Sequence, residues 1–161
     1  MPRTIQKGAF TLLAPIAVLF AACANPVNGA DEELEPVDVV IRDLSGNLIA
    51  ETHGDHWDVE GEGGHGHGLE LEVAGELEVR VFFVAEDGSE FQVEHEEDEL
   101  VVEIDDASVA RYHDHGDHGD FVGVTEGETT ALILLWHGDY PDTGHSHYQS
   151  PPLEIGVVNL Q

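Results

Sequence analysis

Hydrophobic and polar residues alternate with a period of two along most of the chain after residue 36. Leu69, Leu71 and Val73 alternate with glutamates. This alternation is typical of half-buried β-strands, and the spacing of an amphipathic helix is nearly absent. The pattern predicts short strands over residues 37–42, 69–73, 77–85, 91–93, 100–104, 130–136 and 153–157.

These segments together predict the fold class. About seven short strands separated by turn sequences, such as Ser45-Gly46-Asn47, indicate an all-β, antiparallel β-sandwich. Residues 130–136 are continuously apolar, which predicts a strand buried on both faces. Three segments rich in His, Gly and Asp lack the alternation and are expected to be loops: 53–67, 113–119 and 138–148.

The N-terminal segment has the pattern of an export signal. Arg3 and Lys7 precede an apolar run over residues 9–22, which is too short to span a bilayer comfortably and ends in small residues. Phe20-Ala21-Ala22-Cys23 then resembles a bacterial lipobox, with Phe where Leu is usual. The resemblance implies lipidation of Cys23; ordinary cleavage after Ala24 is the alternative.

This interpretation divides the chain into three parts. Residues 1–22 form the signal peptide, residues 23–36 an acidic tether after lipidated Cys23, and residues 37–161 one domain. The expected location is the bacterial periplasm or cell envelope, anchored to the membrane through the lipid on Cys23. A secreted soluble protein is the alternative.

Two segments in the second half resemble a known family. Residues 105–112 read DDASVARY, and residues 119–133 read GDFVGVTEGETTALI. Together they are similar to the second half of a bacterial immunoglobulin-like (Big) domain. The resemblance implies an Ig-like sandwich but says little about function, and the His-rich loops depart from ordinary members.

Composition excludes several classes of protein. Asp and Glu number 34 against five Lys and Arg, which gives a net charge of −29. Without residues 1–22 only three Arg remain, and the charge is about −31. Such a chain cannot neutralise phosphates, so no nucleic-acid partner is expected. One Cys excludes an intrachain disulfide and a Cys-based metal site. The acidity itself does not indicate a function, because adaptation to a saline habitat also explains it.

Histidine is the residue that carries candidate chemistry. All eleven His follow residue 52; nine of them lie in the three predicted loops, and His137 directly precedes the third loop. If residues 138–144 connect a hairpin, His145 and His147 point to one face, with His137 across the ladder. Three nitrogens with one open position is a known zinc arrangement. The expected ligands, including a fourth from the first loop, are His56, His65, His67, His137, His145 and His147.

Other polar residues extend this hypothesis. Asp139 and Asp142 are candidate acceptors that orient the imidazole rings. The segment 113–118 is a candidate second metal site or, equally, a solvated acidic loop. Its candidate ligands are His113, His115, His118, Asp114 and Asp117.

The ligand types select the metal. The predicted domain contains no Cys and no Met, which argues against a Cu(I) site. Imidazole with carboxylates suits Zn²⁺, with Ni²⁺, Co²⁺ and Cu²⁺ as alternatives. Calcium is less favoured because the acidic loops do not follow the EF-hand pattern.

The residues therefore predict an exported protein that binds a divalent metal, zinc first, and buffers it or delivers it to an importer component in the envelope. The alternative is a structural or adhesive cell-surface Ig-like module whose metal only braces loops. An enzyme is not expected, since no nucleophile elbow or zinc-protease motif occurs.

Overall fold

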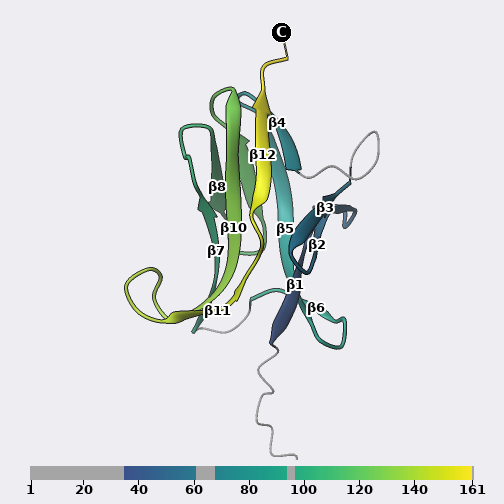
Figure 1. Ribbon diagram of the computed structural model, residues 1–161, viewed down its shortest axis with the longest axis vertical. Coiled ribbons are helices and arrows are strands. Elements are labelled where there is room, and N and C mark those ends of the chain that lie inside the picture. Colours follow the sequence, from purple (N-terminus) through teal and green to yellow (C-terminus); the bar gives the residue numbers. More distant parts are fainter. Residues whose placement is uncertain (1–34, 61–67, 94–96, 161) are drawn as a thin grey trace, which may run out of the picture. The chain divides into compact units, whose positions relative to one another are not determined.

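A computed structural model describes residues 35–60, 68–93 and 97–160. These residues belong to a compact unit, Glu33–Gln161. They form β-strands and connecting turns, arranged as two sheets that lie against each other (Figure 1). In this described part of the chain, no helix is long and apolar enough to cross a membrane. Cys23 and the predicted signal peptide lie outside the described residues.

The first sheet has seven strands in the order β3-β2-β1-β5-β9-β8, with β6 also paired to β5. Their bounds are β1 Pro36–Asp43, β2 Leu48–His53, β3 His56–Val59, β5 Glu76–Ala85, β6 Glu90–Phe91, β8 Ala110–Asp114 and β9 Gly119–Gly123. β5 is the central strand of this sheet. β1 pairs with one edge of β5, and β9 and β6 pair with different parts of its other edge.

The second sheet has five strands: β4 Gly68–Glu72, β7 Asp98–Ile104, β10 Gly127–His137, β11 His145–Gln149 and β12 Leu153–Val158. β7 follows one edge of β10, and β12 and β11 pair with successive parts of the other edge. β4 and β12 pair in parallel. The remaining pairings between described strands are antiparallel, so the predicted sandwich holds with one parallel pair.

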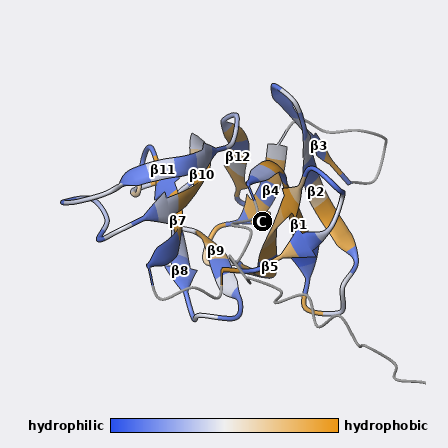
Figure 2. Ribbon diagram, turned by 90° about the horizontal axis from the view of Figure 1, so that it is seen from below, coloured by the Kyte–Doolittle hydropathy of each residue, from blue (hydrophilic) through white to orange (hydrophobic). Residues whose placement is uncertain are grey.

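The core lies between the two sheets and explains the alternation in the sequence. The first sheet contributes Val39, Val81 and Phe83, and the second contributes Ile133 and Ile155, all at most 3% exposed. Burial of each such side chain stabilises the fold by about 1.5–3 kcal/mol. Figure 2 shows hydrophobic stretches on β1, β4 and β5, whereas the His-bearing β8 and β11 are hydrophilic.

The prediction of the fold class is confirmed, but its count of about seven strands was too low. β2, β3, β8, β9 and β11 complete the twelve strands of the described residues. All five include part of a segment predicted to be a loop, although β2 and β9 do so by one residue each. Pairing with a neighbouring strand overrides the turn-forming composition of these segments.

The expectation of a β10 buried on both faces holds only in part. Ala131, Ile133 and Leu135 face the core and are at most 4% exposed. On the outer face, Leu134 is 5% exposed, but Leu132 and Trp136 on either side of it are partly exposed. The apolar run therefore reflects the central position of β10 in its sheet, with burial on the outer face limited to Leu134.

Candidate metal centre

The β10–β11 hairpin holds the best-organised group of histidines. Residues 138–144 connect the two strands, as the sequence predicts, and His137 pairs directly with His145. Gly144 has a φ of +113°, and a Cβ there would collide with the carbonyl oxygen of His137. Glycine at this position therefore lets the two strands approach where the histidines meet.

The three rings of this hairpin lie side by side. Ring centroids are 5.6 Å apart for His137 and His145, 5.3 Å for His137 and His147, and 4.7 Å for His145 and His147. The ladder register shifts between Leu135 and Trp136, opposite His147. We refer to His137, His145 and His147 as the three-histidine cluster.

Carboxylates at the start of the neighbouring strand β7 and directly before it contact this cluster. Asp98 is the direct partner of His137 in the β7–β10 ladder, and its Oδ1 lies 2.9 Å from Nδ1 of His137. Oε2 of Glu97 lies 3.8 Å from Nε2 of the same ring. Neither carboxylate was predicted from the sequence, because nothing local to the histidines indicates that β7 lies beside them.

Asp139, one of the two predicted acceptors, lies in the same region. It lines a surface pocket of about 390 Å³ with His137, and the backbone of Thr143 donates to its carbonyl oxygen. The remaining lining residues are Glu97, Asp98, Glu99, Gly138 and Thr143. An acidic pocket beside imidazoles attracts cations. The ring-orienting acceptor found here is Asp98, and the role of Asp142 stays a prediction.

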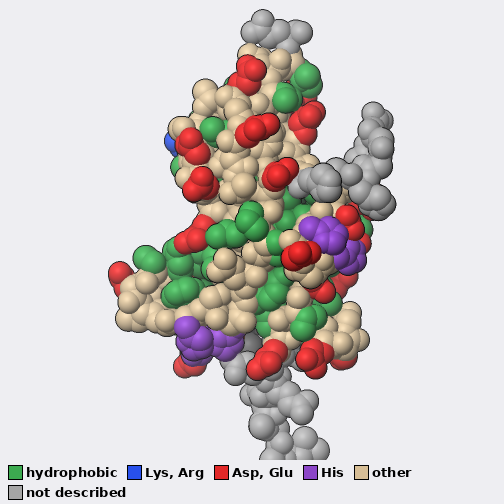
Figure 3. Space-filling view, in the orientation of Figure 1, with side chains coloured by type: hydrophobic (Ala, Val, Ile, Leu, Met, Phe, Trp, Pro, Cys, Tyr) green, Lys and Arg blue, Asp and Glu red, His purple; other side chains and the backbone are tan. Residues whose placement is uncertain are grey.

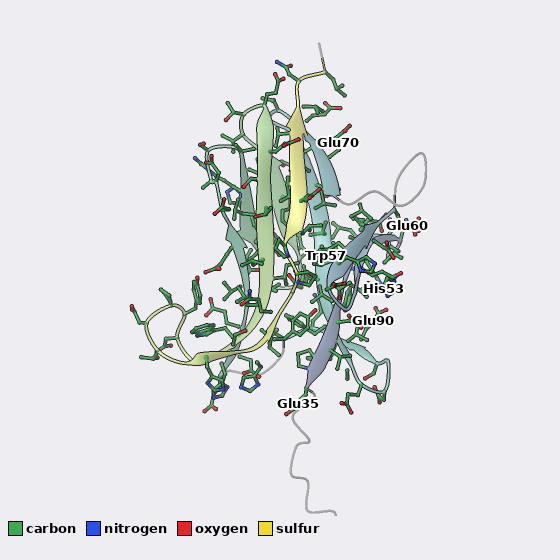
Figure 4. The ribbon with its side chains drawn as sticks, viewed as in Figure 1. Glu35, His53, Trp57, Glu60, Glu70 and Glu90 are labelled. Carbon is green, nitrogen blue, oxygen red and sulfur yellow. The ribbon has the colours of Figure 1, made fainter. Side chains whose placement is uncertain are left out.

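The histidines of the first predicted loop occupy another part of the surface. His53 and His56 pair across the β2–β3 hairpin with ring centroids 6.2 Å apart. His53 also contacts Glu51 and Asp58, at 3.3 and 3.5 Å. On the face shown in Figure 3 histidines form two separate groups, and Figure 4 labels His53 beside β2 and β3.

His56, one of the candidates for a fourth ligand from the first loop, is therefore not part of the described cluster. The ring contacts and ion pairs found for His56 stay within its own hairpin, with His53 and with Asp55 at 3.3 Å. His65 and His67 lie outside the described residues. Their role as ligands stays a prediction.

The third histidine group surrounds the β8–β9 turn. The rings of His115 and His118 stack with centroids 5.0 Å apart. Nδ1 of His118 lies 2.8 Å from Oδ1 of Asp117, and this hydrogen bond holds the pKa of Asp117 below its usual range. Asp114 instead accepts the backbone N–H of Gly116, which closes the turn.

Two residues that the sequence did not single out, Glu78 and Asp120, join this group. Glu78 on β5 pairs directly with Asp120 on β9. One potential ligand atom from each of Glu78, His118 and Asp120 lies within 4.8 Å of the other two. We refer to these residues as the Glu78 cluster. Among described residues, the three-histidine cluster does not meet this spacing, so its rings would have to turn to share an ion.

Comparisons with known proteins add a limited finding. The sequence matches no family model and no curated protein. A solved structure, of domains 4 and 5 of the S-layer protein SbsC, is similar with a TM-score of 0.42 and 15% sequence identity. The similarity covers 96% of this chain and 85% of that chain. Function is therefore inferred from the side chains of this chain.

Proposed function

We propose that this protein binds a divalent metal ion, zinc in the first place, at the three-histidine cluster. The observation that supports this proposal most directly is that the rings of His137, His145 and His147 lie close together in one hairpin. Their centroids are 4.7 to 5.6 Å apart. Imidazole is the commonest biological metal ligand, and three nitrogens with an open position suit zinc.

The spacing of the rings supports a shared ion. Two imidazoles bound to one tetrahedral zinc, at Zn–N distances of about 2.1 Å, have centroids roughly 5 Å apart. The three observed separations bracket that value. The proposal requires each ring to turn so that one of its nitrogens reaches the ion, because the ligand atoms do not meet the spacing of a shared ion in the present arrangement.

Asp98 supports the proposal by orienting one ligand. A carboxylate at Nδ1 of His137 fixes the N–H on that atom and leaves Nε2 for the metal. Asp98 is well placed to hold the ring, because its side chain is only 12% exposed. Glu97, at 3.8 Å from Nε2 of His137, is the nearest candidate for a fourth ligand.

The exposure of the site favours exchange over permanent retention. His145 is exposed, and His137 and His147 are partly exposed, so an ion can reach the cluster and leave it. The net charge of −29 raises the local concentration of cations around the whole surface. Both properties suit a protein that buffers zinc or passes it to an importer component.

We place this activity in the bacterial periplasm or cell envelope. The N-terminal pattern supports export, with a lipid on Cys23 as the membrane anchor, and residues 105–133 support a Big-like sandwich as the carrier. The role is binding rather than catalysis, and nucleic acid is not a partner. Superoxide or hydrolytic turnover by the zinc-loaded protein would contradict this role.

Zinc titration of the purified full-length chain tests the proposal. Replacement of a ligand, His145→Ala, is expected to weaken binding by at least about tenfold, within the range found at metal sites. His53→Ala is the matched control, because it is also an exposed histidine at a strand end beside a hairpin turn. Equal affinities in the two variants would contradict the proposal.

A structural role is the second candidate, and one observation favours it. Asp98, His137 and His145 lie in one row across β7, β10 and β11, so an ion held there would also tie three strands together. In that case zinc raises the melting temperature of the protein but is not transferred to a competing chelator within minutes. Rapid transfer with little change in melting temperature supports buffering or delivery.

A further inference from the structure

We infer that the Glu78 cluster is a second, independent site for a divalent transition metal ion. It lies in the first sheet, on β5, β9 and the turn that precedes β9, whereas the three-histidine cluster lies in the second sheet. Its ligands are two carboxylates and one imidazole, from Glu78, Asp120 and His118. The inference does not depend on the function proposed for the hairpin site.

The sheet register builds this site. Glu78 and Asp120 are direct partners in the β5–β9 ladder, and Asp120 is also the direct partner of His113 in the β8–β9 ladder. Directly opposed residues project from the same face of a sheet. The pairing therefore places two carboxylates next to each other with a histidine beyond them. The two charges repel each other, and a cation bound between them would remove this repulsion.

His118 is oriented as a metal ligand would be. Its Nδ1 is held by Oδ1 of Asp117 at 2.8 Å, which leaves Nε2 as the nitrogen available to an ion. Histidines that bind metals commonly have a carboxylate on the other ring nitrogen. The stacked ring of His115 restricts movement of His118 further.

Asp120 supplies a second, independent indication of a ligand. Its Oδ2 lies 2.8 Å from Nε2 of His115, but its Oδ1 is buried and has no hydrogen-bond partner among the described residues. A buried carboxylate oxygen without a partner destabilises the fold, so such atoms call for an explanation. An ion shared with Glu78 and His118 would satisfy this oxygen.

The ligand set selects a harder ion than the three imidazoles do. Carboxylates suit Mn²⁺, and imidazole suits Zn²⁺, so both ions are candidates for a site with two oxygens and one nitrogen. Water would complete the coordination on the exposed side, because Glu78 is exposed and His118 is partly exposed. Cu(I) is disfavoured because no sulfur ligand is present in the cluster.

The test is a titration with Zn²⁺ and with Mn²⁺ of the full-length triple variant His137→Ala, His145→Ala, His147→Ala, which lacks the hairpin site. We expect it to retain one ion, and Glu78→Gln in this background to weaken binding of that ion by at least about tenfold. Glu76→Gln is the matched control, since Glu76 is an exposed residue on the same face of β5 but opposes Val122. Mn²⁺ should broaden the amide resonances of residues 78 and 118–120 first.

The outcomes separate the two sites. Loss of all binding in the triple variant, or equal affinity in the Glu78→Gln and Glu76→Gln proteins, would overturn the second site. Broadening by Mn²⁺ that is spread evenly over the acidic surface would overturn it too. If the triple variant instead binds as much metal as the unaltered chain, the hairpin site fails, and the Glu78 site stands when Glu78→Gln, but not Glu76→Gln, weakens that binding.

Discussion

Asp98 and His137 are direct partners in the β7–β10 ladder, and Oδ1 of Asp98 lies 2.9 Å from Nδ1 of His137. Since the carboxylate can only accept, the proton on this nitrogen is fixed there. In the neutral ring Nε2 is then the unprotonated nitrogen, and the ring lies beside those of His145 and His147. A residue 39 positions away in the sequence thus orients the central histidine of the cluster.

Removal of this carboxylate tests its role. In Asp98→Ala, the ring of His137 loses its partner at Nδ1, and we expect zinc affinity to fall by about 10- to 100-fold. The measurement is a competition titration against a chromophoric chelator. Asp139→Ala is the control, because Asp139 lines the same acidic pocket but has no side-chain bond to His137 among its described contacts. Equal losses in both variants would indicate a general charge effect instead.

The glycine that closes the hairpin provides a backbone test. Gly144→Ala places a side chain at a φ of +113° and against the carbonyl oxygen of His137. We expect the free energy of unfolding to fall by about 1–3 kcal/mol, together with weaker zinc binding, because the strands must separate at the cluster. Urea unfolding and zinc titration measure the two effects.

Gly46→Ala is the matched control for that substitution. Gly46 also has a positive φ, of +89°, but a Cβ there would meet nothing within 4 Å. We expect only the conformational cost, about 1 kcal/mol, and unchanged zinc affinity. A loss of zinc affinity in both proteins would mean that binding follows overall stability rather than hairpin geometry.

Much of the fold follows from local pattern. Alternation of apolar residues and glutamates predicted β4, β5 and β12, since a period of two places every second residue in the core. The hairpin of His137 and His145 was also predictable, because its two strands are joined by a short segment. Local spacing determines which residues oppose each other in such a hairpin.

The partners from distant strands were not predictable in this way. Asp98 reaches His137, and Glu78 reaches Asp120, only because β7 pairs with β10 and β5 with β9. One sequence contains no local indication of those pairings, and 34 acidic residues offer many equal choices. Strand pairing also explains why the His-rich segments begin or end as strands despite their turn-forming composition.

Ionic strength should affect the fold and the metal site in opposite directions. The net charge of −29 destabilises the compact state through self-repulsion, which salt screens. We therefore expect the melting temperature to rise between about 0.05 and 1 M NaCl, where the Debye length falls from above 10 Å to about 3 Å. Zinc affinity should fall over the same range, since attraction of the cation is screened as well.

Choline chloride is the control salt for this experiment. Screening depends on ionic strength and not on the identity of the cation, so choline chloride should raise the melting temperature as NaCl does. A rise with NaCl alone would instead indicate specific binding of sodium ions to the acidic surface.

The Arg42–Glu90 ion pair between β1 and β6 gives a prediction about pH. Arg42 donates to both carboxylate oxygens of Glu90, at 3.0 and 2.6 Å, and this holds the pKa of Glu90 below its usual range. A lowered folded-state pKa means that the stabilisation is fully present above the unfolded-state pKa, about 4.3, and is lost as pH falls through the folded-state pKa. The pair is partly exposed, so its contribution is at most about 1 kcal/mol.

Glu90→Gln should therefore reduce the free energy of unfolding near neutral pH, and the difference from the unaltered protein should shrink as pH falls below about 4. Urea unfolding at several pH values measures this difference. Glu70→Gln is the control, since Glu70 is an exposed strand glutamate without a described ion pair, and its difference should stay near zero throughout. A difference for Glu90→Gln that stays constant with pH would show that the carboxylate charge does not stabilise this strand contact.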